Sequence, residues 1–175
     1  MTTERLNEIK LIIAKEYPND YEMQKLTLDD QIDSYKKLEK LKDKNLNDTI
    51  FTNIVLSVEK EWKDDYEMQL LTIKEQIKSL KKLKAYANND IPKKILEEIK
   101  GYTTDEYPND YEMQLITIKE QVKSAKKILN YKNEKIPNNI LESIKKDALD
   151  EWKNDYEMQL DTIKTQVKAW VQLNK

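Results

Sequence analysis

The chain contains no histidine and no cysteine among its 175 residues. Without histidine it lacks the side chain that most often transfers protons near neutral pH. Without cysteine it has no thiol nucleophile and forms no disulfide, and the usual zinc and iron sites lose their commonest ligands. These absences exclude most familiar catalytic and metal-binding arrangements. We therefore expect a protein that is not an enzyme and that holds neither a metal nor a cofactor.

Glycine and proline are also scarce, with one glycine and four prolines in the whole chain. Hairpins and the turns of β proteins depend on these residues, whereas lysine, glutamate, leucine, glutamine and isoleucine dominate here and favour helices. No apolar run approaches the ~20 residues that a membrane helix needs, and residues 1–15 lack the apolar centre of a signal peptide. We expect an all-α, cytoplasmic protein without a membrane partner.

Basic charge does not exceed acidic charge, since 31 lysines and arginines face 33 aspartates and glutamates. Arg5 is the only arginine in the chain. Proteins that bind nucleic acids are normally basic, and those that recognise base edges or phosphates depend on arginine. The composition therefore predicts no specific nucleic-acid partner.

One short phrase, DYEMQ, occurs four times at a constant spacing. Its tyrosine stands at Tyr21, Tyr66, Tyr111 and Tyr156, 45 residues apart each time. The period divides the chain into modules at approximately 1–44, 45–89, 90–134 and 135–175, which we expect to form one domain over 1–175. Each module contains two stretches with apolar residues at the spacing of an amphipathic helix.

The predicted fold is therefore all-α, with four tandem two-helix repeats stacked as a short α-solenoid. Two-helix units of 45 residues resemble HEAT-type repeats in period and architecture only. The second helix of each module is expected to begin at the motif. Asn19 followed by Glu22 has the spacing of a capping box, as do the equivalent pairs that begin at Asp64, Asn109 and Asn154. The acids of DYEMQ are thus assigned to helix starts rather than to catalysis.

The first and last modules depart from the repeat at particular positions. Lys25 replaces the leucine found at Leu70, Leu115 and Leu160, and Arg5 replaces the isoleucine found at Ile50, Ile95 and Ile140. In the last module, Asp161 replaces the aliphatic residue found at Leu26, Leu71 and Ile116. Because the end modules of a stack have one uncovered flank, we expect these polar residues to lie on the free flanks. Removal of the fourth module should then expose Ile116.

A set of uncharged polar residues recurs without a role in helix starts or in the apolar stripe. Its members are Gln24, Thr27, Gln31, Gln69, Thr72, Gln76, Gln114, Thr117, Gln121, Gln159, Thr162 and Gln166. The two glutamines of a module lie about 20° apart around the helix and about 10.5 Å along it. They either form a buried hydrogen-bonded ladder or line an uncharged polar groove that contacts a partner. The tyrosines Tyr21, Tyr66, Tyr111 and Tyr156 either pack at the helix–helix corner or offer stacking platforms.

These observations favour a non-enzymatic binding, adaptor or inhibitor protein. The predicted binding face comprises the glutamines, threonines and tyrosines of the second helices, and the expected partner is another protein. Small size and a lysine-rich, cysteine-free composition suggest an accessory factor of a bacterium or phage, such as an anti-defence inhibitor. The alternative is a protein that binds or sequesters a small polar, nucleotide-like ligand.

Overall fold

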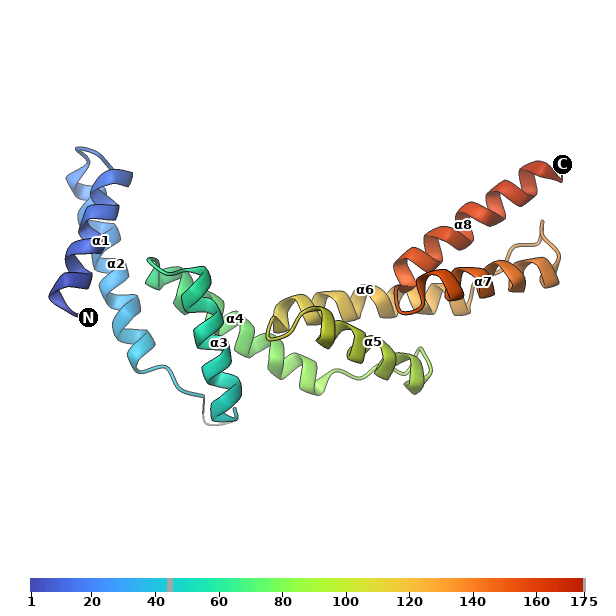
Figure 1. Ribbon diagram of the computed structural model, residues 1–175, viewed down its shortest axis with the longest axis horizontal. Helices are drawn as coiled ribbons and strands as arrows, with labels where there is room; N and C mark the ends of the chain where they lie inside the picture. Colours follow the sequence, from blue (N-terminus) through green and yellow to red (C-terminus); the bar gives the residue numbers. More distant parts are fainter. Residues whose placement is uncertain (44–45, 175) are drawn as a thin grey trace. The chain divides into compact units, whose positions relative to one another are not determined.

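The computed structural model describes residues 1–43 and 46–174, which form eight helices and no strand (Figure 1). The helices are α1 (Thr3–Glu16), α2 (Tyr21–Glu39), α3 (Asp48–Glu61), α4 (Tyr66–Ala85), α5 (Lys93–Glu106), α6 (Tyr111–Leu129), α7 (Asn138–Trp152) and α8 (Tyr156–Leu173). Each module contributes two helices, and each second helix begins at the tyrosine of DYEMQ. The predicted all-α repeat fold is confirmed. The predicted boundary between the first two modules, at 44 and 45, lies outside the described residues.

The chain divides into two compact units, Met1–Lys78 and Ser79–Lys175, and the division falls within α4. In the first unit α1 packs against α2. In the second unit α5 packs against α6, and α8 packs against both α7 and α6. Contact of α8 with the helix two places earlier is what stacking of one repeat on the next requires. That all four modules form a single domain stays a prediction.

The core of the second unit shows how one module continues into the next. One cluster of buried residues comes mainly from the third module and comprises Ile91, Leu96, Ile99, Ile118, Val122, Ala125 and Tyr156. Tyr156 belongs to the fourth module, so its second helix begins inside the core of the preceding one. A second cluster, formed by Ile136, Leu141, Ala148, Ile163 and Val167, joins α7 and α8.

The second helices are capped by an aspartate one residue after the predicted position. An Oδ1 atom of Asp20 accepts a hydrogen bond from the backbone N–H of Met23 at 3.0 Å. Asn19 and Asn109 instead adopt the left-handed conformation, with φ of 66°, which asparagine tolerates better than most residues. Asp65, Asp110 and Asp155 cap the other three helices in the same way. The predicted caps at Asn19, Asp64, Asn109 and Asn154 were therefore wrong by one residue.

One of the two expected flank positions behaves as predicted. Leu70, Leu115 and Leu160 are buried, whereas the side chain of Lys25, in the first of the four modules, is 78% exposed. The other position does not, because Leu26, Leu71 and Ile116 are 54%, 53% and 42% exposed. These side chains are thus in large part open to solvent rather than buried between modules. Ile116 is already exposed in the presence of the fourth module, so the expectation that this residue becomes exposed only on removal of that module was wrong.

Arg5 also differs from its predicted role on a free flank. Its guanidinium donates hydrogen bonds to the Tyr66 hydroxyl at 3.0 Å and to the Lys63 carbonyl at 2.7 Å, and it pairs with Asp64 at 2.8 Å. The guanidinium carbon lies 5.5 Å from the centroid of the Tyr66 ring. Hydrogen bonding, with Tyr66 as the largest contributor, raises the pKa of Arg5 above its already high value. The side chain thus ties α1 to the corner where α4 begins.

We expect Arg5→Met to lower the free energy of unfolding of the first unit by about 1 kcal/mol. The variant keeps much of the aliphatic stem but loses the hydrogen bonds and the stacking on Tyr66, in a setting that solvent partly screens. Lys25→Met, at an exposed site of the same unit, is the matched control. Thermal unfolding followed by circular dichroism would show the difference. Equal midpoints for the two variants would mean that the Arg5 network contributes nothing.

Candidate functional site

The first glutamine of each second helix closes the corner of its own module. Its Nε2 donates to a backbone carbonyl at the end of the preceding helix, at 2.7–2.8 Å in all four modules. The four donor–acceptor pairs are Gln24 with Tyr17, Gln69 with Trp62, Gln114 with Tyr107 and Gln159 with Lys153. Carbonyls at a helix C-terminus have no hydrogen-bond donor within the helix, and the glutamine amide supplies one.

The second glutamine connects one module to the next. The Oε1 of Gln31 accepts the backbone N–H of Tyr66 at 2.7 Å, and its Nε2 donates to Asp65 at 2.8 Å. In the second unit, Gln121 makes the same two bonds, to the N–H of Tyr156 at 2.6 Å and to Asp155 at 3.2 Å. The glutamine therefore caps the first turn of the following module's second helix.

Burial of the glutamines follows from these bonds. Gln31, Gln69, Gln76, Gln114, Gln121 and Gln159 are buried, and Gln24 is partly buried. Gln166, in the fourth module, is exposed. The glutamine side chains that bond across the corners and between modules therefore form a buried ladder and do not line an open groove. Direct contact of this set with a partner stays a prediction.

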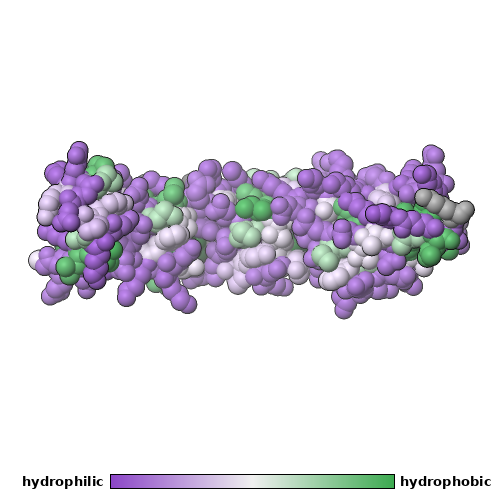
Figure 2. All heavy atoms as spheres, turned by 90° about the horizontal axis from the view of Figure 1, so that it is seen from above, coloured by the Kyte–Doolittle hydropathy of each residue, from purple (hydrophilic) through white to green (hydrophobic). Residues whose placement is uncertain are grey.

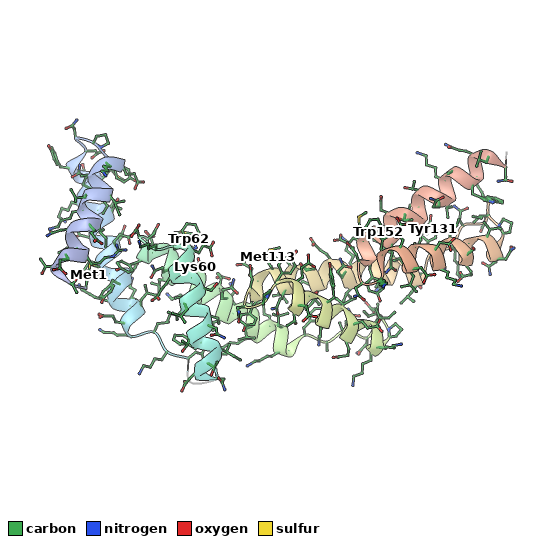
Figure 3. All side chains as sticks on the ribbon, in the orientation of Figure 1. Met1, Lys60, Trp62, Met113, Tyr131 and Trp152 are labelled. Atoms are coloured by element: carbon green, nitrogen blue, oxygen red, sulfur yellow. The ribbon has the colours of Figure 1, made fainter. Side chains whose placement is uncertain are left out.

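The threonines and tyrosines of the predicted face have unequal surroundings. Thr27, Thr72, Thr117 and Thr162 are all partly buried. Thr162 accepts a hydrogen bond from the Trp152 indole at 3.0 Å, which holds the tryptophan at the end of α7 (Figure 3). Tyr21 is 74% exposed, Tyr66 and Tyr111 are partly buried, and Tyr156 is buried. The Arg5 guanidinium lies over the Tyr66 ring, and the centroids of the Tyr66 and Tyr35 rings are 5.0 Å apart in an edge-to-face arrangement. The tyrosines thus offer no uniform set of platforms.

A cleft in the first unit brings two of the predicted residues together. Thr27 and Gln31 line it, and its volume is about 510 Å³. Lys63 and six carboxylate side chains also line it, and one of these acids, Asp64, pairs with the Arg5 guanidinium at 2.8 Å; the acids are Glu16, Asp30, Glu61, Asp64, Asp65 and Glu67. Acidic side chains therefore outnumber basic ones in the wall of this cleft.

The sequence did not identify the exposed aliphatic residues Leu26, Leu71 and Ile116 as functional candidates. In the second unit, Met113 lies one turn before Ile116 and is also exposed. Figure 2 shows separate hydrophobic patches on a mostly hydrophilic surface. The available signal was Asp161, because a position that accepts aspartate in one module does not need an apolar residue for folding.

The second unit contains a larger groove between α5 and α7, with a volume of about 670 Å³. Ile95 and Leu149 lie on its two walls, and Ala125 and Tyr156 lie between them. The rim carries Lys146 and Lys153 together with acidic residues. This groove can accept an apolar group next to a charged one.

Within 1–43 and 46–174, no group of three or more histidine, cysteine, aspartate or glutamate side chains is arranged to hold a metal ion. No helix in that part of the chain has the length and apolar character to cross a membrane. Comparison with protein-family models, curated proteins and solved structures gives no match.

Proposed function

We propose that the protein is a non-enzymatic binding module whose second helices contact a protein partner through their outer faces. The observation that carries this proposal is the exposed aliphatic side chain at Leu26, Leu71 and Ile116. Folding does not explain it, because solvent-facing helix positions accept lysine or glutamate without loss. Burial of each side chain against a partner would be favourable, because it removes apolar surface from water.

The charges around these residues indicate the character of the partner. In each of the first three modules an acidic residue lies four positions before the aliphatic one and another four positions after it. These acids are Glu22 and Asp30, Glu67 and Glu75, and Glu112 and Glu120. Residues four apart are neighbours on a helix surface, so each aliphatic side chain lies between two carboxylates. A protein surface with an apolar centre and a basic rim would complement this pattern.

The other candidates have less support. A nucleotide-like ligand would bring phosphates toward the acidic cleft of the first unit, where six carboxylates line the wall, and like charges repel most strongly where water is scarce. A protein partner is therefore preferred. Its setting as a bacterial or phage inhibitor or adaptor, and a cytoplasmic location, stay predictions.

The test places a photo-crosslinking amino acid at Leu71 in the cells that produce the protein, with the same label at Leu56 as control. Leu56 is exposed to a similar degree on the first helix of the same module. We expect one discrete adduct from position 71 and none from position 56. With the partner purified, Leu26→Ser together with Leu71→Ser should weaken binding at least about tenfold, because buried aliphatic anchors carry much of an interface's free energy.

The same double variant should unfold within about 0.5 kcal/mol per site of the parent, as exposed positions do. This measurement separates loss of contact from loss of fold. A stable double variant that retains the parental affinity for the crosslinked partner would refute the proposed face.

A further inference from the structure

A repeated junction holds the start of one module's second helix against the preceding module. In the first unit, the Oε1 of Gln31 accepts the backbone N–H of Tyr66 at 2.7 Å, and its Nε2 donates to Asp65 at 2.8 Å. Four residues after this glutamine, the Tyr35 ring meets the Tyr66 ring edge-to-face, with centroids 5.0 Å apart. The receiving side is therefore a glutamine and an aromatic ring one turn apart, and the inserted side is the Asp-Tyr pair that begins the next helix.

The second unit forms the same junction with different packing around the tyrosine. Gln121 accepts the N–H of Tyr156 at 2.6 Å and donates to Asp155 at 3.2 Å. Tyr156 is only 7% exposed and lies in one buried cluster with Val122 and Ala125. Since both units use the same glutamine and the same helix start, the junction is a property of the repeat and not of one pair of helices.

The fourth module presents the receiving side of this junction to solvent. Gln166 is exposed on α8, whereas its equivalents in the first three modules are buried. Ala169 is exposed as well, whereas the serines at the same position of the other modules are buried; these are Ser34, Ser79 and Ser124. Trp170 lies four residues after Gln166, where the first module has Tyr35. Helix α8 thus carries an amide and an aromatic ring at the spacing that the first unit uses to receive a helix start.

The first module presents the inserted side. Tyr21 is 74% exposed, whereas the tyrosines that begin α4 and α8 are partly and fully buried. Asp20 already accepts the backbone N–H of Met23 at 3.0 Å, so this helix start has the same capped form as at the two junctions. A groove of about 470 Å³ lies beside Tyr21, and Leu11 and Leu28 supply apolar surface in its wall. A preformed helix start next to apolar surface needs little ordering when a partner binds.

We propose that copies of this chain associate head to tail, with Asp20 and Tyr21 of one copy seated on Gln166 and Trp170 of another. Gln166 then accepts the Tyr21 N–H and donates to the Asp20 carboxylate, as Gln31 does at the start of α4. The Tyr21 ring packs against the Trp170 indole, an aromatic pair that favours edge-to-face contact.

A second copy is the partner that fits, because this one chain carries both sides of a junction that it also forms within each unit. The two sides differ, so the contact is heterologous and allows assemblies of more than two copies. It does not depend on the protein partner proposed for the outer faces.

Lys25 limits the strength of this contact. Leucine stands at its position in the other three modules and is buried there, whereas the Lys25 side chain is 78% exposed and pairs with Asp29 at 2.8 Å. A lysine can cover apolar surface with its stem while its ammonium stays in water, so it weakens the contact without preventing it. We expect a dissociation constant on the order of 1 mM for the parent chain. Lys25→Leu should lower it at least about tenfold, because leucine adds apolar area at a position that the internal junctions bury.

Sedimentation velocity of the full chain over roughly 10 µM to 1 mM measures this association, and the Lys25→Leu chain is the reference for further variants. In that background, Tyr21→Ala should weaken association at least about tenfold, because a tyrosine at the centre of an interface carries much of its free energy. Gln166→Glu should weaken it similarly, because it removes the amide donor and places a carboxylate against Asp20. Tyr21 and Gln166 are both exposed, so neither change should disturb the fold.

A mixture of the two variants tests the direction of the contact. The Tyr21→Ala chain keeps an intact receiving side, and the Gln166→Glu chain keeps an intact inserted side. Each alone should stay largely monomeric where the reference associates. Their equimolar mixture should form pairs with the affinity of the reference and nothing longer, because one intact junction is available per pair. Leu26→Ser, at an exposed position of the same helix, should leave association unchanged, which separates this contact from the outer face.

Three results would overturn the proposal. The first is a Lys25→Leu chain that stays monomeric at about 0.5 mM. The second is an association that Tyr21→Ala and Gln166→Glu leave unchanged. The third is a mixture of those two variants that associates no better than either alone, which would identify a symmetric contact between like surfaces instead.

Discussion

Leu160→Lys should lower the free energy of unfolding of the second unit by about 3–5 kcal/mol. Leu160 is 5% exposed on α8, which packs against both α6 and α7. Loss of a buried leucine side chain costs about 2–5 kcal/mol, and an ammonium group brought into the same space adds the cost of its dehydration. Small domains have only about 5–15 kcal/mol of stability in total. The variant should therefore populate unfolded second unit at ambient temperature.

The chain provides a matched control for this substitution at the equivalent position of the first module. Lys25→Leu makes the reverse change at a side chain that is 78% exposed, so it should alter stability by no more than about 0.5 kcal/mol. Urea titrations followed by circular dichroism would give both values. Equal effects of the two exchanges would contradict the view that a preceding module is needed to bury this position.

The helical repeat could be predicted because its evidence is local. The apolar spacing within each stretch and the constant return of Tyr21, Tyr66, Tyr111 and Tyr156 do not depend on how distant parts meet. The residue that caps each second helix was harder to predict. Asn19 and Asp20 are both good capping residues, and only the structure shows that the asparagine adopts positive φ and leaves the cap to its neighbour.

Errors about the module flanks have a different physical origin. Leu70 and Leu71 are adjacent and both apolar, but they lie about 100° apart around the helix. The sequence shows that both are apolar and not which of them a neighbouring helix covers. Arg5 looked like a solvent-exposed end residue, yet its long side chain folds back over Tyr66. A long amphipathic side chain can cover apolar surface that a charge-based interpretation assigns to solvent.

The groove of the second unit illustrates a limit of the repeat pattern itself. The equivalent positions Tyr35, Leu80, Ala125 and Trp170 carry side chains of very different size. The consequence of alanine depends on the helices around it, because the same junction in the first unit is filled by Tyr35 and Arg5. In the second unit Tyr156 belongs to the same buried cluster as Ala125, so position in the repeat predicts where a side chain lies and its neighbours decide how it packs.

The contribution of the buried glutamines to stability can be measured at two equivalent positions, one buried and one exposed. Gln121→Ala should lower the free energy of unfolding of the second unit by about 1–3 kcal/mol, because it leaves a buried backbone N–H without its acceptor. Gln121 is buried and accepts the N–H of Tyr156 at 2.6 Å. Gln166 occupies the same place in the fourth module but is exposed, so Gln166→Ala should change stability by no more than about 0.5 kcal/mol.

Amide hydrogen exchange locates the effect at one bond. The first N–H groups of a helix have no intrahelical partner and normally exchange fast, but Gln31 and Gln121 accept those of Tyr66 and Tyr156. We expect slow exchange at these two amides and fast exchange at Tyr21, for which the described residues provide no glutamine acceptor. Gln121→Ala should accelerate exchange at Tyr156 while leaving Tyr66 unchanged, because the lost acceptor belongs to one junction only. If Gln121→Ala and Gln166→Ala were equally stable and the Tyr156 amide kept its protection, the glutamine would not be what joins one repeat to the next.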